Sequence, residues 1–122
     1  MLFPLAMWKV RHGMAGRFRA FGRSMEPVIP HGSRVTIERV AADRIERGDI
    51  VVAQVGGSTM LHLVKEVESL AGRAEIAGTS GPANGWTTLD RIHAICTEIG
   101  GEPVPGASEK VERRRRRPVA SG

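Results

Sequence analysis

The chain has 122 residues, which is enough for one domain built around a single hydrophobic core. Hydrophobic residues make up 41% of it and charged residues 25%, a balance that is typical of globular chains and excludes fibrous or wholly disordered classes. The formal net charge of +5 is uneven, because residues 1–23 carry +5, residues 24–108 carry −4 and residues 109–122 carry +4. Any contact with nucleic acid or an anionic membrane is therefore expected of the two ends and not of the acidic body.

Cys96 is the single cysteine of the chain, so no intramolecular disulfide can form. It lies in an apolar run and is predicted to be a small buried residue, which fits a reducing compartment and a cytoplasmic location. The apolar N-terminal stretch 1–8 is far shorter than the roughly 20 residues that a membrane-crossing helix needs. We therefore predict no transmembrane span, with peripheral membrane association through Leu2, Phe3 and Trp8 as the alternative.

Metal and nucleotide chemistry are not indicated by the sequence. His12, His31, His62 and His93 are scattered along the chain and lack the spacing of a zinc site. No glycine-rich phosphate loop precedes a predicted helix. We expect neither a metal nor a cofactor.

Short strands separated by turns dominate the middle of the chain. Residues 1–20 mix apolar and basic side chains without a clear period, and Gly13 and Gly16 disfavour a long helix there. From residue 34 onward, β-branched and apolar runs alternate with turns rich in Gly, Ser and Asp. Closely spaced short strands predict a mainly β domain with a small curled-sheet or barrel-like fold. The predicted strands are residues 34–40, 50–55, 59–68, 73–77 and 91–99.

Composition divides the chain into three predicted parts. Residues 1–17 are a basic and apolar lead segment, residues 18–100 the folded domain, and residues 101–122 a disordered basic tail rich in Gly, Pro, Ser, Glu and Arg. Five consecutive arginines, 113–117, stand in this tail. They are interpreted first as solvated, with weak nucleic-acid or anionic-membrane contact through 109–122 as the alternative.

The sequence GRSMEP places Ser24 between a glycine, Gly22, and Pro27. Glycine permits backbone directions that other residues avoid, and proline restricts the residue before it, so a bend is predicted. A hydroxyl exposed at this bend is expected to have the backbone amides of Ser24 and Arg23 beside it, and two such amides form an oxyanion hole. Met25 and Pro27 are expected to shape the bend.

Three features in this order resemble a known family. They are the motif SMEP that begins at Ser24, the glycine Gly32 just before the strand at 34–40, and Gly48 in the run GDIVV. Together they resemble the peptidase superfamily that holds LexA-type repressors and type I signal peptidases, over about residues 18–99. The resemblance implies a LexA-type β fold, a Ser24 nucleophile and a peptide or protein substrate.

In that family the partner of the nucleophile is usually lysine, and in endoplasmic-reticulum and archaeal signal peptidases it is histidine. Matching the valine-rich strands brings His62 to the base position, 38 residues after Ser24 (62 − 24). An imidazole with an ordinary pKa of about 6.5 accepts a proton near neutral pH, whereas lysine must lose several units from about 10.4. Lys65 is the alternative base, but it is expected on the opposite strand face, where Glu66 and Glu68 would keep it charged.

The resemblance implies acyl transfer by a Ser–His dyad. His62 takes the proton of Ser24, Ser24 attacks a peptide carbonyl, and the amides of Ser24 and Arg23 stabilise the oxyanion before water hydrolyses the acyl-enzyme. The cleaved bond would lie in a partner protein or in the chain itself. The alternative function is a catalytically inactive binding or regulatory module whose basic ends contact nucleic acid or an anionic membrane.

The Gly-Asp-Asn box of signal peptidases is absent from this chain. The sequence GTSG from Gly78, followed by NGW from Asn84, occupies that region. No aspartate is therefore obviously available to orient His62. Ser80 is the first candidate for this role, and Asp90 the second.

Overall fold

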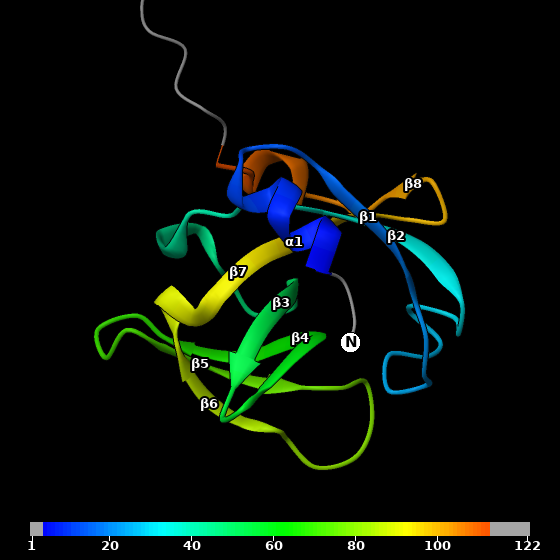
Figure 1. Ribbon diagram of the computed structural model, residues 1–122. Helices are drawn as coiled ribbons and strands as arrows, with labels where there is room; N and C mark the ends of the chain where they lie inside the picture. The colour runs from blue at the N-terminus through cyan, green and yellow to red at the C-terminus, as the bar shows by residue number, and fades with distance from the viewer. Residues whose placement is uncertain (1–3, 113–122) are drawn as a thin grey trace, which may run out of the picture.

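The computed structural model describes residues 4–112, in which all strands join one antiparallel sheet (Figure 1). The strands run in the order β1-β2-β7-β3-β4-β5-β6, and β8 pairs with the last two residues of β7, Glu98 and Ile99. The prediction of a mainly β, curled-sheet fold is confirmed. The elements are α1 (Pro4–Arg11), β1 (Gly16–Ala20), β2 (Ser33–Glu38), β3 (Ile50–Val55), β4 (Ser58–Glu68), β5 (Arg73–Ala77), β6 (Gly85–Thr88), β7 (Ile92–Ile99) and β8 (Glu102–Pro103), with 3₁₀ turns at Ala42–Arg44, Leu89–Arg91 and Ser108–Lys110.

Breaks in strand register make the sheet curl. The pairings of β2 with β7, of β3 with β7 and of β4 with β5 each contain a bulge or irregularity. Such a bulge bends its strand and increases the local twist. The far strand β6 consequently reaches back to β3, where the hydroxyl of Thr87 donates to the carbonyl oxygen of Gln54 at 2.6 Å.

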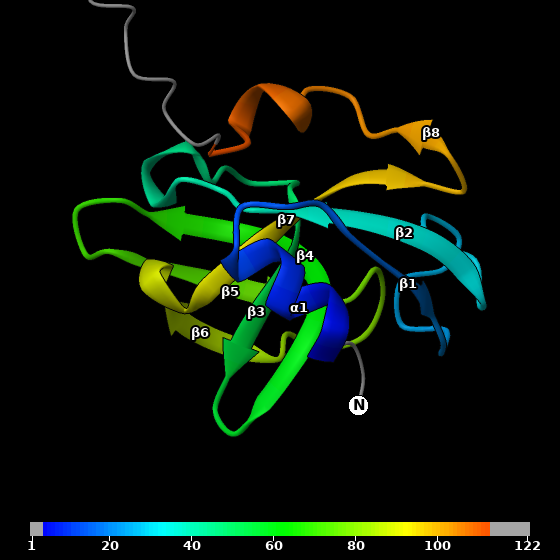
Figure 2. The same ribbon diagram turned by 45° about the horizontal axis from the view of Figure 1, so that its top comes forward.

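Strand β3 is buried on both faces of this curled sheet. Ile50 and Val52 pack in the hydrophobic cluster beneath α1, whereas Val51 and Ala53 pack in the cluster on the opposite face. Burial on both faces explains why the strand is a continuous apolar run without alternation. Figure 2 shows α1 lying close to β1 and β3, and its buried residues are Ala6, Met7 and Val10.

The N-terminal segment is part of the folded unit. Helix α1 packs into the cluster that also contains β2, β3 and β7, and the expected boundary between residues 17 and 18 falls inside β1. The helix has only 8 residues, of which three are buried and two, Lys9 and Arg11, are basic. It is therefore too short for a helical period of apolar residues to be recognised in the sequence. The structure therefore differs from the expectation of a separate lead segment.

The segment 101–112 is also folded, which differs from the predicted disorder. Ala107 is 3% exposed, and Val111 forms a β-bridge with Val40. Lys110 donates to Asp49 at 2.8 Å; burial lowers the pKa of Lys110, but hydrogen bonds to Asp49 and to Glu46 raise it by more. A few apolar residues at irregular spacing, buried against a finished sheet, leave no periodic signal in the sequence. The remaining tail, 113–122, lies outside the described residues.

The contact between α1 and β1 predicts that Gly16→Ala destabilises the fold. A Cβ at Gly16 would meet the carbonyl oxygen of Ala6 and would lie 2.9 Å from its Cα, which is backbone that cannot rotate away. We expect the free energy of unfolding to fall by about 1–3 kcal/mol, as for other overpacked sites, measured by urea denaturation. Gly57→Ala is the matched control, because a Cβ there meets nothing within 4 Å; equal stability of the two variants would contradict the prediction.

Candidate functional site

Ser24 is exposed in the loop 21–32, which closes the hairpin of β1 and β2. Gly22 has a φ of +108°, in the region that favours glycine, and its N–H donates to Nδ1 of His31 at 2.8 Å. A cis peptide bond precedes Pro27. The loop therefore contains the bend that the glycine and the proline predict.

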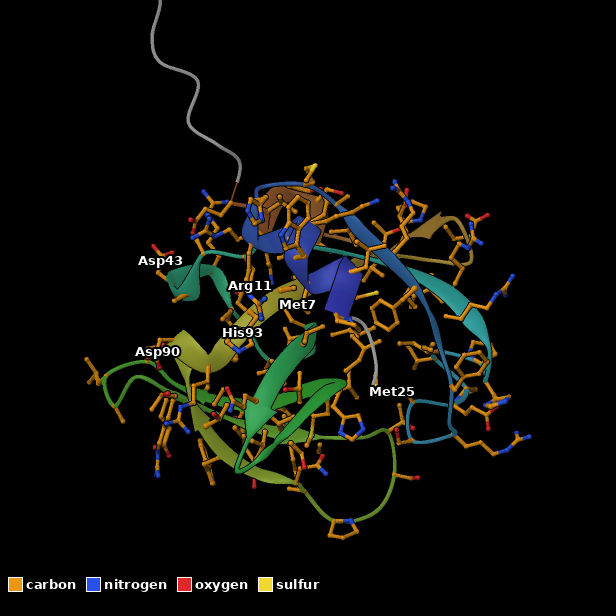
Figure 3. The ribbon with its side chains drawn as sticks, viewed as in Figure 1. Met7, Arg11, Met25, Asp43, Asp90 and His93 are labelled. Carbon is orange, nitrogen blue, oxygen red and sulfur yellow. The ribbon has the colours of Figure 1, made fainter. Side chains whose placement is uncertain are left out.

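Two buried side chains and one carboxylate hold this loop in place. Met25 and Ile29 are 5% and 2% exposed and pack in the cluster beneath α1, and Figure 3 shows Met25 close to that helix and the sheet. Glu26 accepts a hydrogen bond from the His31 N–H at 3.3 Å and one from the Arg23 guanidinium at 3.1 Å. These two bonds, the backbone bond first, hold the pKa of Glu26 below its ordinary value. Both ends of the loop are thus tied to one charged group.

A second loop, residues 78–84 between β5 and β6, presses against the first. The N–H of Thr79 donates to the carbonyl oxygen of Ser24 at 2.9 Å, and the Thr79 hydroxyl donates to the carbonyl oxygen of Glu26 at 2.5 Å. A Cβ at Gly78 would lie 2.6 Å from the Ser24 carbonyl oxygen, so this approach requires glycine. The position of Ser24 therefore depends on a segment more than fifty residues further along the chain.

The structure brings His62 of β4 to Ser24. Nε2 of His62 lies 2.9 Å from Oγ of Ser24, and Nδ1 lies 2.6 Å from Oδ1 of Asn84. A carbonyl oxygen can only accept, so Nδ1 carries a proton that it donates to Asn84. Nε2 of the neutral ring is then the acceptor for the Ser24 hydroxyl. Asn84 is itself anchored, because its N–H donates to the carbonyl oxygen of Ile76 at 2.7 Å.

Lys65, the alternative base, is not brought to Ser24 in the same way. Its side chain is exposed, and it is not among the residues that line the hollow at Ser24. The two neighbouring glutamates pair elsewhere: Glu66 with Arg47 at 3.8 Å and Glu68 with Arg73 at 2.6 Å.

The two candidates for orienting His62 are replaced by Asn84. Ser80 is exposed in the loop 78–84, and Asp90 stands beside His93 at the opposite side of the view from Met25 (Figure 3). Asn84 was not among the predicted candidates, because it stands 22 residues from His62 and nothing local in the sequence shows that the two side chains meet. The available signal was its position at the end of the region that replaces the Gly-Asp-Asn box.

The backbone amides of Arg23 and Ser24 lie in the exposed part of the loop. Within the described chain, no acceptor forms a hydrogen bond with either amide. Donors that are already oriented and not occupied by the protein can stabilise a negative oxygen as it develops. The two amides are thus unoccupied donors, and the oxyanion hole stays a prediction.

Neither a cysteine nucleophile nor a metal site is supported by the described residues. Burial raises the pKa of the Cys96 thiol to about 12, so it stays protonated near neutral pH and is a poor nucleophile. Across residues 4–112, no three His, Cys, Asp or Glu side chains gather in a way that could hold a metal ion. No helix in the same range is long and apolar enough to cross a bilayer.

A hollow of about 600 Å³ opens beside Ser24 and His62. Two strands border it: β1 stands at one end of the sheet order, and the part of β4 before Leu63 pairs with β3 but not with β5. Backbone groups on this edge of β4 are able to pair with another extended chain. The apolar side chains that line the hollow are Phe18, Ala20, Phe21, Met25, Ile29, Met60 and Leu61.

Comparison with known proteins identifies the family of the chain. Residues 3–76 match the family described as Peptidase S24-like, and the matched range contains both Ser24 and His62. No curated protein and no solved structure matches the chain. Because the family match covers more than half of the 122 residues, the chain belongs to the Peptidase S24-like family, within the LexA/signal-peptidase superfamily.

Proposed function

We propose that this protein is a serine endopeptidase that hydrolyses a peptide bond with Ser24 as nucleophile and His62 as general base. The observation that carries the proposal is the 2.9 Å contact between Nε2 of His62 and Oγ of Ser24. A general base is expected within about 2.6–3.2 Å of the heavy atom whose proton it removes, and the distance between Nε2 and Oγ lies in that range. Family membership and the exposure of Ser24 support the same reaction.

The proposed reaction has two acyl-transfer steps. Nε2 of His62 takes the hydroxyl proton while Oγ of Ser24 bonds to the carbonyl carbon, and the amides of Ser24 and Arg23 receive the oxyanion. The imidazolium gives its proton to the leaving amine, and the C–N bond breaks. Water then attacks the ester, with His62 as base again, and releases the acid and the free serine.

The hollow favours an extended peptide as substrate. The edge of β4 before Leu63 offers main-chain hydrogen bonds of the kind used when a peptide adds to a sheet. Its apolar lining would take up uncharged side chains next to the cleaved bond. The bond would lie in a partner protein or, as the less favoured case, in this chain.

A binding module without turnover is the second candidate. It is favoured by one observation, which is that the imidazole of His62 is bonded to an amide and not to a carboxylate. In that case the basic ends would contact nucleic acid or an anionic membrane, and the arginines that would do so, 113–117, lie outside the described residues.

Labelling with a fluorophosphonate probe tests the proposal. The wild type is expected to be labelled at serine, Ser24→Ala to lose the label completely, and His62→Ala to be labelled about 10²–10⁴-fold more slowly, the usual contribution of a general base. Lys65→Ala is the matched control, since Lys65 is exposed outside the hollow, and it should be labelled at the wild-type rate.

Each other outcome has a definite meaning for the assignment. Label that persists in Ser24→Ala would overturn the nucleophile, and loss in Lys65→Ala alone would make lysine the base. A folded wild type that takes up no label would instead favour the binding module.

Contact between the two loops predicts that Gly78→Ala slows labelling of Ser24. The added Cβ would lie 2.6 Å from the Ser24 carbonyl oxygen and would push the serine away from the imidazole. We expect labelling to slow by about tenfold to a hundredfold, because small displacements of a nucleophile are costly. Gly57→Ala should label like the wild type, as its Cβ meets nothing within 4 Å; a Gly78→Ala variant that matched it would contradict this account of the loop contact.

A further inference from the structure

We propose that Asn84 is the positioning residue of the Ser24–His62 pair, and that it selects the proton position on the imidazole without adding charge. The inference rests on the proposed function and goes beyond it, because neither the sequence nor the family match indicates a partner for Nδ1. Its basis is a continuous chain of two contacts, 2.6 Å from Asn84 Oδ1 to His62 Nδ1 and 2.9 Å from Nε2 to Ser24 Oγ.

The amide oxygen determines which ring nitrogen is the base. An imidazole that donates from Nδ1 to Asn84 must present an unprotonated Nε2 toward Ser24 when it is neutral. Without this acceptor, the ring can carry its proton on Nε2, where it cannot accept from the serine. The hydrogen bond also limits rotation of the ring about its bond to Cβ. Asn84 thus performs the orienting role of a carboxylate in a triad.

The main chain makes Asn84 a rigid partner. Its N–H donates to the carbonyl oxygen of Ile76 at 2.7 Å, so the residue is attached to β5 just before β6 begins. The same loop is tied to the nucleophile through Thr79 and Ser24 at 2.9 Å. One short segment therefore places both the serine and the group that orients the histidine.

A neutral partner places no negative charge beside the imidazole of His62. An aspartate would stabilise the imidazolium that forms during attack, whereas an amide offers a dipole alone. Among residues 4–112, no carboxylate contacts the ring in its place: β3 and the loop 78–84 contain no ionisable residue, and Glu26 is bonded to Arg23 and His31. The other ionisable residues on neighbouring elements are Arg17 and Arg19 of β1, Lys65, Glu66 and Glu68 of β4, and Arg73 and Glu75 of β5.

Two variants at position 84 separate orientation from charge. Asn84→Ala removes the acceptor and should slow fluorophosphonate labelling by roughly tenfold or more, part of the 10²–10⁴-fold that a general base contributes. Asn84→Asp keeps an acceptor and adds a charge, so it should label at least as fast as the wild type at pH 8. The acidic limb of its pH–rate profile should move to higher pH, because the carboxylate favours the protonated ring. Ser80→Ala, an exposed change in the same loop, is the matched control and should label like the wild type.

A second readout does not depend on turnover. In protein labelled with ¹⁵N-histidine, long-range ¹H–¹⁵N spectra distinguish the two neutral tautomers, and the His62→Gln variant identifies the signals of His62. We expect a protonated Nδ1 in the wild type, in Ser80→Ala and in the neutral form of Asn84→Asp, and a loss of this preference in Asn84→Ala.

An Asn84→Ala variant with the wild-type tautomer and the wild-type labelling rate would overturn the inference. If the folded wild type takes up no label, the proposed function fails, and the tautomer measurement still decides whether Asn84 positions the ring. If the wild type is labelled and the tautomer is unchanged in Asn84→Ala, the positioning role fails while the proposed function stands.

Discussion

The hydrogen bond from the Thr79 N–H to the carbonyl oxygen of Ser24 joins two loops that follow strands at opposite ends of the sheet order. The first loop closes the hairpin of β1 and β2, and the second connects β5 and β6, which end the sheet order on the other side. These loops meet because the sheet curls at its register breaks. In a flat sheet the serine and the segment that holds it would be separated by the whole width of the sheet.

The same curl lets the middle strands serve as a rigid base for the site. Strand β3 is buried on both faces, and β4 lies next to it with His62 paired to Val51. His62 thus projects from a strand segment that is paired with this buried neighbour, which suits a group proposed to keep a fixed distance from Ser24. The loop that holds Ser24 gains comparable rigidity from the burial of Met25 and Ile29.

Replacing an acidic partner by Asn84 changes the electrostatics of the pair more than its geometry. The short contact to Oδ1 orders the ring as a carboxylate would, but the site contains no added negative charge. An amide at this exposed position therefore orients the ring without the stabilisation of the imidazolium that a carboxylate would give.

Local patterns accounted for much of the sheet. Strands β3 and β5 have the predicted bounds, because apolar or alternating runs between turns are a direct signal of strand geometry. Strands β1 and β6 were not predicted, since GRFRA and GWTT are short and begin with glycine. Helix α1 and the segment 101–112 were also misjudged, because their few apolar residues become buried only against a sheet formed by other parts of the chain.

For the site, the sequence by itself determined the bend at Ser24, since the effects of a glycine and a proline on the backbone are local. It also pointed to His62, since the order of the family's motifs along the chain can be read without a structure. The sequence did not determine that Asn84 is the hydrogen-bond partner of His62. The contact between His62 and Asn84 spans 22 residues and depends on where the loop 78–84 lies over β4. Only the tertiary structure decided this, because the curl of the sheet brings that loop to His62, and no local pattern of residues encodes the curl.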